Sequence, residues 1–473
     1  MTVSACSKKK HPPGPACAGG EVLGQEMRLA LSRGAGQGRA APVALRRAIV
    51  VGPSRRSVLA GSAALALGGA LGGPLGLSLS RAARAQGPAA DAQTRLKVAS
   101  VTRIELGGQT PLALFQNLIP GPVLRVKRGD RLAVSVENTL ETPLSLNWQG
   151  VRVPNALDGV PGLTGTAITK GGSADIAFTA PDAGTYLYRA FQPELAHRAL
   201  AGALIVTEEG ASPYAADHVM LIQSWAPDPT MKVPLLTVNG AVSPTFEAPA
   251  AGRVRLRLVN AGTHFLRLKL DAPCYAIAID GQPVQVPFLL KDGRAQLTPG
   301  GRLDLALDVG TADPIPLNVE TSELPVQLAL VTPVGAGTAD AATTSPPVAL
   351  PSNGLPEKIP LEKAARFEVP IGASVVPLSG FASVGSVARG TSVVLTFDNS
   401  SEAPVAMQLH GAPCRQLDGM DDGWKPWWHD AVAVPAKSKV RVALLADAPG
   451  KWALVGLRGG DGAVVAARSY EVT

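Results

Sequence analysis

Two stretches of this chain repeat each other without a gap, and no other feature constrains the possible fold as strongly. Residues 126–150 read VKRGDRLAVSVENTLETPLSLNWQG, and residues 387–411 read VARGTSVVLTFDNSSEAPVAMQLHG. The stretches that follow also correspond, since APDAGTY at 180–186 matches ADAPGKW at 446–452. A shorter and more diverged copy begins at Gly252. A repeat of this kind indicates one structural unit used three times.

The repeated unit is predicted to be made of β-strands. Apolar residues alternate with other residues in 132–136, in 440–444 and in 254–258, where the intervening residues are charged. Period two with turn residues between the runs is typical of strands with one buried face. The 51 Gly and 41 Pro of the chain punctuate such short strands. We therefore expect an all-β chain of three β-sandwich domains.

The repeat also predicts the domain boundaries. The domains are expected at 86–212, 213–332 and 366–473, and the Pro/Ala/Thr/Ser-rich segment 333–365 is interpreted as a linker. Residues 1–85 are interpreted as a leader.

The leader carries the features of a twin-arginine export signal. Arg55 and Arg56 lie in the run SRRSVL at 54–59, an apolar Gly/Ala-rich stretch follows to about residue 79, and Ala-Arg-Ala at 83–85 offers a cleavage site. A transmembrane anchor is the alternative, but the stretch is rich in small residues and weakly hydrophobic, which favours cleavage. We expect the twin-arginine export machinery as a partner, a periplasmic location and no stable membrane span after cleavage.

The formal net charge of +7 belongs to the leader. Residues 1–85 carry 12 Lys/Arg and 2 Asp/Glu, which leaves 32 basic and 35 acidic residues in 86–473 and a net charge of −3 there. This balance argues against a nucleic-acid partner.

Two of the four cysteines, Cys274 and Cys414, lie after the leader. An exported compartment would permit a disulfide between them. The alternative is a pair of buried free thiols, which the sequence favours because their spacing resembles no metal motif.

Several runs resemble multicopper oxidases, and the resemblance covers nearly all of 100–473. They lie at 151–162, 184–188, 236–240, 279–283 and 422–430. The resemblance implies three cupredoxin-like Greek-key β-sandwich domains. It also implies a type 1 copper and a trinuclear copper cluster, bound by four His-x-His-type motifs and one Cys, because imidazole and thiolate hold copper in both oxidation states.

The residues at the four motif positions depart from the family pattern. In order along the chain they are Asn147 and Gln149, Arg189 and Phe191, Val405 with Gln408 and His410, and Val455 with Gly456 and Leu457. His410 is the only retained ligand position. Residues 86–473 contain five His, whereas the resembling family uses about ten across its copper sites. A cation at position 189 would also repel copper. We therefore expect no bound copper and no catalytic or cofactor-binding residues.

Several other side chains near these positions could bind a metal or take part in catalysis, and each also has a structural interpretation. His410 is either a lone weak ligand or, as we favour, a buried histidine satisfied by hydrogen bonds. His429 is interpreted as a packing or surface residue. Met407 and Met420 suggest a copper(I) site, but strand alternation places Met407 and His410 on opposite faces. Asp421 and Asp422 are adjacent and form a poor carboxylate dyad for the same reason.

The leading functional hypothesis is a periplasmic, non-catalytic binding or scaffold protein with an unknown protein or small-molecule partner. It resembles the copper-lacking, cell-division-associated homologue of this family, although fold analogy does not fix a role. The alternatives are a copper-dependent oxidoreductase with an altered metal site and a small-ligand binder that uses the former copper cavity.

Overall fold

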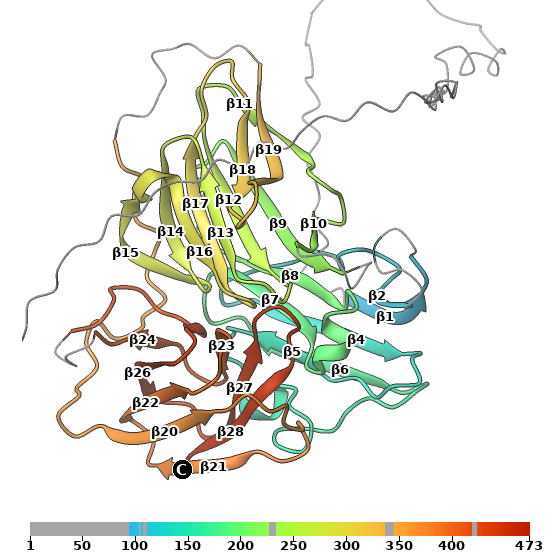
Figure 1. Cartoon of the computed structure of the whole chain (residues 1–473), viewed down its shortest axis with the longest axis vertical. Coiled ribbons are helices and arrows are strands. Elements are labelled where there is room, and N and C mark those ends of the chain that lie inside the picture. The colour runs from blue at the N-terminus through green and yellow to red at the C-terminus, as the bar shows by residue number, and fades with distance from the viewer. Residues whose placement is uncertain (1–93, 104–105, 107–110, 227–232, 336–344, 419–422) are drawn as a thin grey trace, which may run out of the picture. The chain divides into compact units, whose positions relative to one another are not determined.

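The computed structural model describes residues 94–103, 106, 111–226, 233–335, 345–418 and 423–473. Over these residues the chain is almost entirely β (Figure 1). The helical elements there are the short helix α2 (Pro193–Ala196) and the 3-10 helices η1 (Asn155–Leu157) and η2 (Lys291–Gly293). The strands form six sheets. The all-β prediction is therefore confirmed, and the leader, with Arg55 and Arg56, lies outside the described residues.

The first two sheets share one hydrophobic core, which contains Trp148, Tyr186 and Tyr188. One sheet has the order β2-β1-β4-β6, and the other has the order β3-β8-β7-β5. Their strands are β1 (Thr94–Val101), β2 (Leu112–Phe115), β3 (Leu124–Lys127), β4 (Arg131–Asn138), β5 (Leu146–Gln149), β6 (Ser173–Thr179), β7 (Gly184–Ala190) and β8 (Ala201–Thr207).

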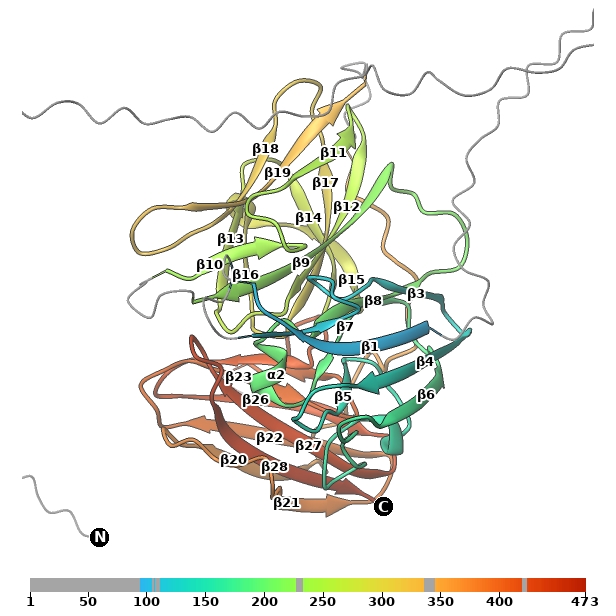
Figure 2. The ribbon, with the colours of Figure 1, turned by 90° about the vertical axis from the view of Figure 1, so that its right-hand side faces the viewer.

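The next two sheets enclose a core rich in Leu and Val, drawn in green to yellow in Figure 2. Their orders are β10-β9-β12-β17-β14-β15 and β11-β19-β18-β13-β16. Their strands are β9 (Ala216–Trp225), β10 (Leu235–Val238), β11 (Thr245–Pro249), β12 (Arg253–Asn260), β13 (Leu266–Leu270), β14 (Cys274–Ile279), β15 (Gln282–Leu289), β16 (Arg294–Leu297), β17 (Arg302–Asp308), β18 (Ile315–Val319) and β19 (Val326–Val334).

The last two sheets pack around a third core, which includes Phe397, Met407 and Trp452. Their orders are β20-β22-β26-β24 and β21-β28-β27-β23-β25. Their strands are β20 (Ala365–Ile371), β21 (Ala382–Val387), β22 (Thr391–Asn399), β23 (Val405–Leu409), β24 (Cys414–Gln416), β25 (Ala431–Val434), β26 (Ser438–Ala446), β27 (Gly450–Arg458) and β28 (Val464–Val472). The repeated stretches thus occupy equivalent strands, β4–β5 and β22–β23.

The expected strands form, but one of them is buried on both faces. In β4 the apolar residues Leu132, Val134 and Val136 are buried and alternate with partly exposed residues, as period two predicts. In β12 the arginines that should face solvent are also buried, since Arg255 and Arg257 are 2% and 1% exposed. The prediction of a half-buried strand was wrong there, because acidic side chains from other strands cover the charged face.

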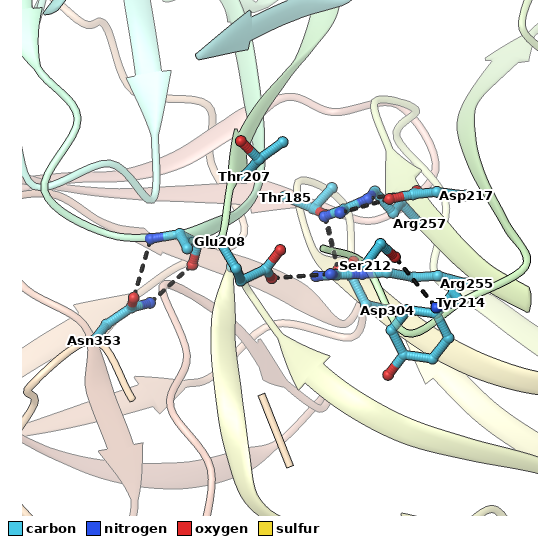
Figure 3. Close-up of polar contacts among 12 residues, drawn as sticks. Thr185, Thr207, Glu208, Ser212, Tyr214, Asp217, Arg255, Arg257, Asp304 and Asn353 are labelled. Carbon is cyan, nitrogen blue, oxygen red and sulfur yellow. Dashed lines mark hydrogen bonds and ion pairs between the residues drawn. The ribbon is translucent and has the colours of Figure 1, made fainter. Parts of the chain in front are cut away.

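The buried arginines of β12 are neutralised by a cluster of carboxylates (Figure 3). Asp304 of β17 accepts hydrogen bonds from Arg255 Nη2 at 2.7 Å and from Arg257 Nη1 at 3.3 Å. Glu208 accepts from Arg255 at 2.9 Å, and Asp217 accepts from Arg257 at 2.7 Å. Because buried charges are costly unless paired, this cluster ties the strands that carry it into one unit.

The segment expected to be a linker is irregular where it is described, between β19 and β20, yet part of it is buried. Asn353 is 5% exposed and exchanges hydrogen bonds of 2.9 and 3.0 Å with the backbone of Ala183. It also donates to the side chain of Gln282 at 2.9 Å. Among the described elements, no helix has the length and apolar character needed to cross a lipid bilayer.

Candidate functional site

Two pairs of adjacent strands carry the former ligand positions. In the first pair, β5 and β7, Asn147 lies opposite Arg189. In the second pair, β23 and β27, Gln408 lies opposite Val455. Strand alternation fixes which side chains share a face, so the spacing of the predicted motif positions is kept in the geometry of the strands.

The structure brings residues of the first and third predicted motifs to one cavity. Asn147, Gln149, Gln408 and His410 all line it, together with Asp158. Nδ2 of Asn147 lies 3.5 Å from Nδ1 of His410, although 263 residues separate them in the chain. The cavity is the candidate functional site, and its lining is largely polar.

His410 is held by a carboxylate. Its side chain is buried, and its Nδ1 lies 2.9 and 3.0 Å from the two carboxylate oxygens of Asp158. A carboxylate only accepts, so Nδ1 donates the hydrogen, and the 3.5 Å approach of the Asn147 amide is a contact rather than a bond. Asn147 instead donates to the carbonyl of Asp158 at 2.9 Å. The predicted burial and hydrogen bonding of His410 are confirmed, whereas the absence of a metal on His410 stays a prediction.

A second buried network lies on the other side of Gln149. Both guanidinium nitrogens Nη1 and Nη2 of Arg302 donate to the carboxylate of Asp430, the first at 2.7 Å. Gln149 donates to Asp430 at 3.4 Å and to the carbonyl of Gly300 at 3.1 Å. Burial opposes the charge of Arg302, but Asp430 and Asp280 raise its pKa above the ordinary value. Arg302 is therefore protonated, whereas burial raises the pKa of Asp430 above its ordinary value although the charge of Arg302 opposes that shift.

His429 has a specific partner, which its interpretation as a packing or surface residue did not include. Its Nδ1 lies 3.0 Å from Oδ2 of Asp280, and its side chain is 20% exposed. Burial alone would raise the pKa of Asp280, but the charges of Arg302 and His429 hold it below the ordinary value. His429 thus joins the network of Arg302 and not the cavity of His410.

Apolar side chains occupy the remaining former ligand positions. Val455 and Leu457 pack in one cluster with Val160, and Phe191 lies against it. Val405 and Met407 are fully buried in the third core, so Met407 points away from the cavity of His410 as predicted. Met420, Asp421 and Asp422 lie outside the described residues.

Arg189 is buried beside the cavity, at 6% exposure. Burial and the neighbouring charge of Arg302 lower the pKa of Arg189 to about 10. Its side chain still carries a positive charge at neutral pH, since that pKa remains well above 7. The positively charged side chain of Arg189 therefore occupies a predicted ligand position, at which the resembling family binds a copper ion.

Both cysteines of the described chain are free and buried. Burial raises the pKa of the Cys274 thiol to about 11 and that of Cys414 well above its ordinary value. Thiols in this state are poor nucleophiles and poor metal ligands. The interpretation as unpaired buried thiols is confirmed.

The residues around the cavity do not fit a copper centre. Within the described ranges, no group of three or more His, Cys, Asp or Glu side chains is placed to hold a metal ion. The cavity offers one imidazole, three side-chain amides and two carboxylates, of which Asp158 is engaged with that imidazole and Asp430 with Arg302. Copper prefers several imidazoles and a thiolate, and the two thiols are not among the lining residues.

Four charged residues of this site were not singled out from the sequence. They are Asp158, Asp280, Arg302 and Asp430. Asp158, Asp280 and Asp430 lie in runs that carry the family resemblance, but nothing in those runs indicates that each would bind a side chain more than 100 residues away. Arg302 is the first residue of β17, and no pattern in the sequence around it indicates a functional role.

Comparisons with known proteins agree with the resemblance. Two sequence profiles described as multicopper oxidase match residues 97–211 and 373–454. Multicopper oxidase MmcO of Mycobacterium tuberculosis is 26% identical over 427 residues, covering 74% of this chain and 81% of its own length. Copper resistance protein A of Escherichia coli is 31% identical over 179 residues, but the match spans only 29% of that protein and 36% of this chain.

Solved structures give the same result over a larger part of the chain. A multi-copper oxidase from Pseudomonas thermotolerans superposes with a TM-score of 0.71 at 25% identity, covering 81% of this chain and 99% of the other. Lac15 from a marine microbial metagenome superposes with a TM-score of 0.68 at 27% identity, covering 80% and 100%. The strand arrangement and the sequence similarity therefore extend over the same region.

Proposed function

The chain belongs to the multicopper oxidase family, and we propose that it is an exported, copper-free member that works as a binding or scaffold protein rather than as an oxidase. Family membership supplies the fold. The side chains at the former ligand positions carry the proposal, because an oxidase of this family requires copper at them.

The observation that carries most weight is the chemical identity of the cavity. Asn147, Gln149 and Gln408 present amides, and the guanidinium of Arg189 is buried beside them. Amides are weak copper ligands, and a fixed positive charge opposes a second cation strongly in a site shielded from water. Without bound copper, such a site contains no redox centre that could transfer electrons to oxygen.

The apolar replacements support the same proposal. Val455 and Leu457 are 3% and 4% exposed and pack with each other and with Val160. Apolar side chains packed together at these positions offer no ligand atoms to a metal.

Export through the twin-arginine pathway to the periplasm is the second part of the proposal. It rests on Arg55 and Arg56 in the run at 54–59, on the apolar stretch that follows and on the Ala-Arg-Ala site at 83–85. The binding partner is expected to be a periplasmic protein or small molecule.

One observation favours an alternative, a copper-dependent oxidoreductase with an altered metal site. A carboxylate that holds one nitrogen of an imidazole is a common arrangement for a metal-binding histidine, and Asp158 holds His410 in this way. A single imidazole gives at most weak binding, because the ligands that would accompany it are missing.

Copper loading separates the two functions. The purified protein is incubated with Cu(II) and with Cu(I) under reducing conditions, desalted, and analysed for bound metal, for visible absorption and for oxygen uptake with a phenolic substrate. We expect substoichiometric copper, no thiolate-to-copper band and no oxygen uptake. His410→Gln is the matched variant, and tightly held stoichiometric copper that is lost in it would refute the proposal in favour of the alternative.

A further inference from the structure

Arg189 is a buried cation whose charge is not matched. Its side chain is 6% exposed on β7, and across the described part of the chain its guanidinium makes no hydrogen bond or ion pair. Arg255 and Arg302 differ in this respect, since each binds a buried carboxylate, and the buried Arg415 at least donates to the backbone carbonyl of Glu357. A buried guanidinium without a partner is rare, because removing its charge from water is costly.

Asp430 is the carboxylate whose charge most affects Arg189, and it is already bound to another arginine. Asp430 favours the charged form of Arg189, but Arg302 opposes it. Asp430 receives two hydrogen bonds from the guanidinium of Arg302 and a third, at 3.4 Å, from Gln149. Asp430 is therefore held by Arg302 and Gln149, and among the residues that the structure describes no carboxylate binds the guanidinium of Arg189 directly.

A small cavity lies directly against this guanidinium. Arg189, Asn147, Gln408 and His197 line its polar part, and Phe191 and Leu457 contribute to its apolar part. The cavity has room for about one water-sized sphere. A cavity of roughly this size holds one water molecule or one atom of similar dimensions.

Gln408 lines the same cavity and carries an orphaned donor. Nε2 of Gln408 is fully buried and has no hydrogen-bond partner, and the residue as a whole is 6% exposed. Buried donors in native proteins are almost always satisfied, by protein, by water or by a bound ion. A residue with an unpaired charge and a residue with an unsatisfied amide therefore line one small cavity.

We propose that this cavity is a binding site for one small monovalent anion of halide size, held by the guanidinium of Arg189 and the amide Nε2 of Gln408. The proposal rests on the proposed copper-free state, because copper at the neighbouring positions would change the electrostatics of the whole cavity. A water molecule would satisfy the two donors but would leave the charge of Arg189 unmatched. An anion of one atom satisfies both.

The same features set the selectivity of the site. Polyatomic anions such as sulfate and gluconate are larger than the single water-sized space that the cavity offers. His197 adds no charge at neutral pH, because burial and the nearby charge of Arg189 lower its pKa to about 4. Affinity is therefore expected to depend on Arg189 for charge and on Gln408 for one neutral hydrogen bond.

Thermal unfolding in different sodium salts tests the proposal. The melting temperature of the full chain is measured from 1 to 300 mM chloride, with gluconate added to keep the ionic strength constant. Binding to the native state should raise the melting temperature in a saturable way. In Arg189→Met the chloride dependence should disappear, and in Gln408→Leu the chloride affinity should fall about fivefold, as for one neutral hydrogen bond. The exposed Arg389→Met is the matched control and should behave as the parent chain.

Bromide gives a direct readout that does not depend on the variants folding. Crystals of the parent protein grown with bromide should show an anomalous scattering peak between Arg189 and Gln408. Equal melting temperatures in chloride and gluconate, a chloride effect that persists in Arg189→Met, or the absence of that peak would each overturn the anion site. Copper loading is scored separately, so stoichiometric copper would refute the copper-free function, whereas a copper-free protein without halide binding would refute this inference alone.

Discussion

Replacing Asp304 by Asn should destabilise the protein strongly, because this carboxylate is shared by two buried arginines. Asp304 is 1% exposed and accepts hydrogen bonds from Arg255 at 2.7 and 3.0 Å, from Arg257 at 3.3 Å and from Thr185 at 2.9 Å. Asp304→Asn keeps the shape of the side chain but removes its charge and turns an amide donor toward two guanidinium groups.

The size of the loss follows from what each arginine retains. Removing one partner of a buried ion pair costs about 3–5 kcal/mol. Arg255 keeps Glu208, and Arg257 keeps Asp217, and these carboxylates are 19% and 28% exposed. Neither arginine is left without a partner, so we expect the lower end of that range, about 3 kcal/mol.

Urea denaturation followed by tryptophan fluorescence measures this loss, with the free energy taken from the first unfolding transition. Asp447→Asn is the matched control, because Asp447 pairs with Arg389 at 3.1 Å on the surface, where the two side chains are 61% and 62% exposed. An exposed pair contributes about 0.2–1 kcal/mol. A loss for Asp304→Asn no larger than that of Asp447→Asn would show that the cluster does not hold these strands together.

Three further predictions concern the former copper site, the pH dependence and export. Histidine is installed at three former ligand positions, Asn147, Gln149 and Gln408. We expect no oxygen turnover and a destabilisation of about 1–3 kcal/mol for each unpaired imidazole, measured by oxygen uptake and urea melts; rapid turnover would show a preformed metal pocket. His197 has a pKa of about 4 against 6.5 in an unfolded chain, so the unfolded state binds more protons between these values. Stability is therefore undiminished above pH 6.5 and falls by up to about 3 kcal/mol as the pH drops toward 4. His197→Gln should flatten this part of the melting profile, and an unchanged profile would contradict the assignment. Replacing Arg55 and Arg56 by Lys should leave the precursor in the cytoplasm by cell fractionation, because the export receptor distinguishes the arginine pair from charge alone, and normal export would rule out the twin-arginine route.

Local patterns were sufficient to predict the strands, and they also led to the prediction that the copper ligands are lost. Alternation of apolar residues in 132–136 marks β4 because a strand turns successive side chains to opposite faces, whatever lies around it. The changed residue types at the four motif positions are likewise visible without coordinates, since ligand chemistry depends on the side chain itself. The internal repeat also predicted that β5 and β23 occupy equivalent places in their domains.

Burial of charge was decided by contacts between distant segments. The alternating arginines of β12 have the pattern of a solvent-facing row, and only the approach of Asp304, Asp217 and Glu208 makes their burial possible. His410 and Asp158 lie 252 residues apart in the chain, and Arg302 and Asp430 lie 128 apart. No local pattern encodes such partners, because each strand fixes the direction of its own side chains, whereas the packing of whole sheets decides what those side chains meet. The unmatched charge of Arg189 emerges at that level as well, since it depends on Arg302 having already taken the carboxylate of Asp430.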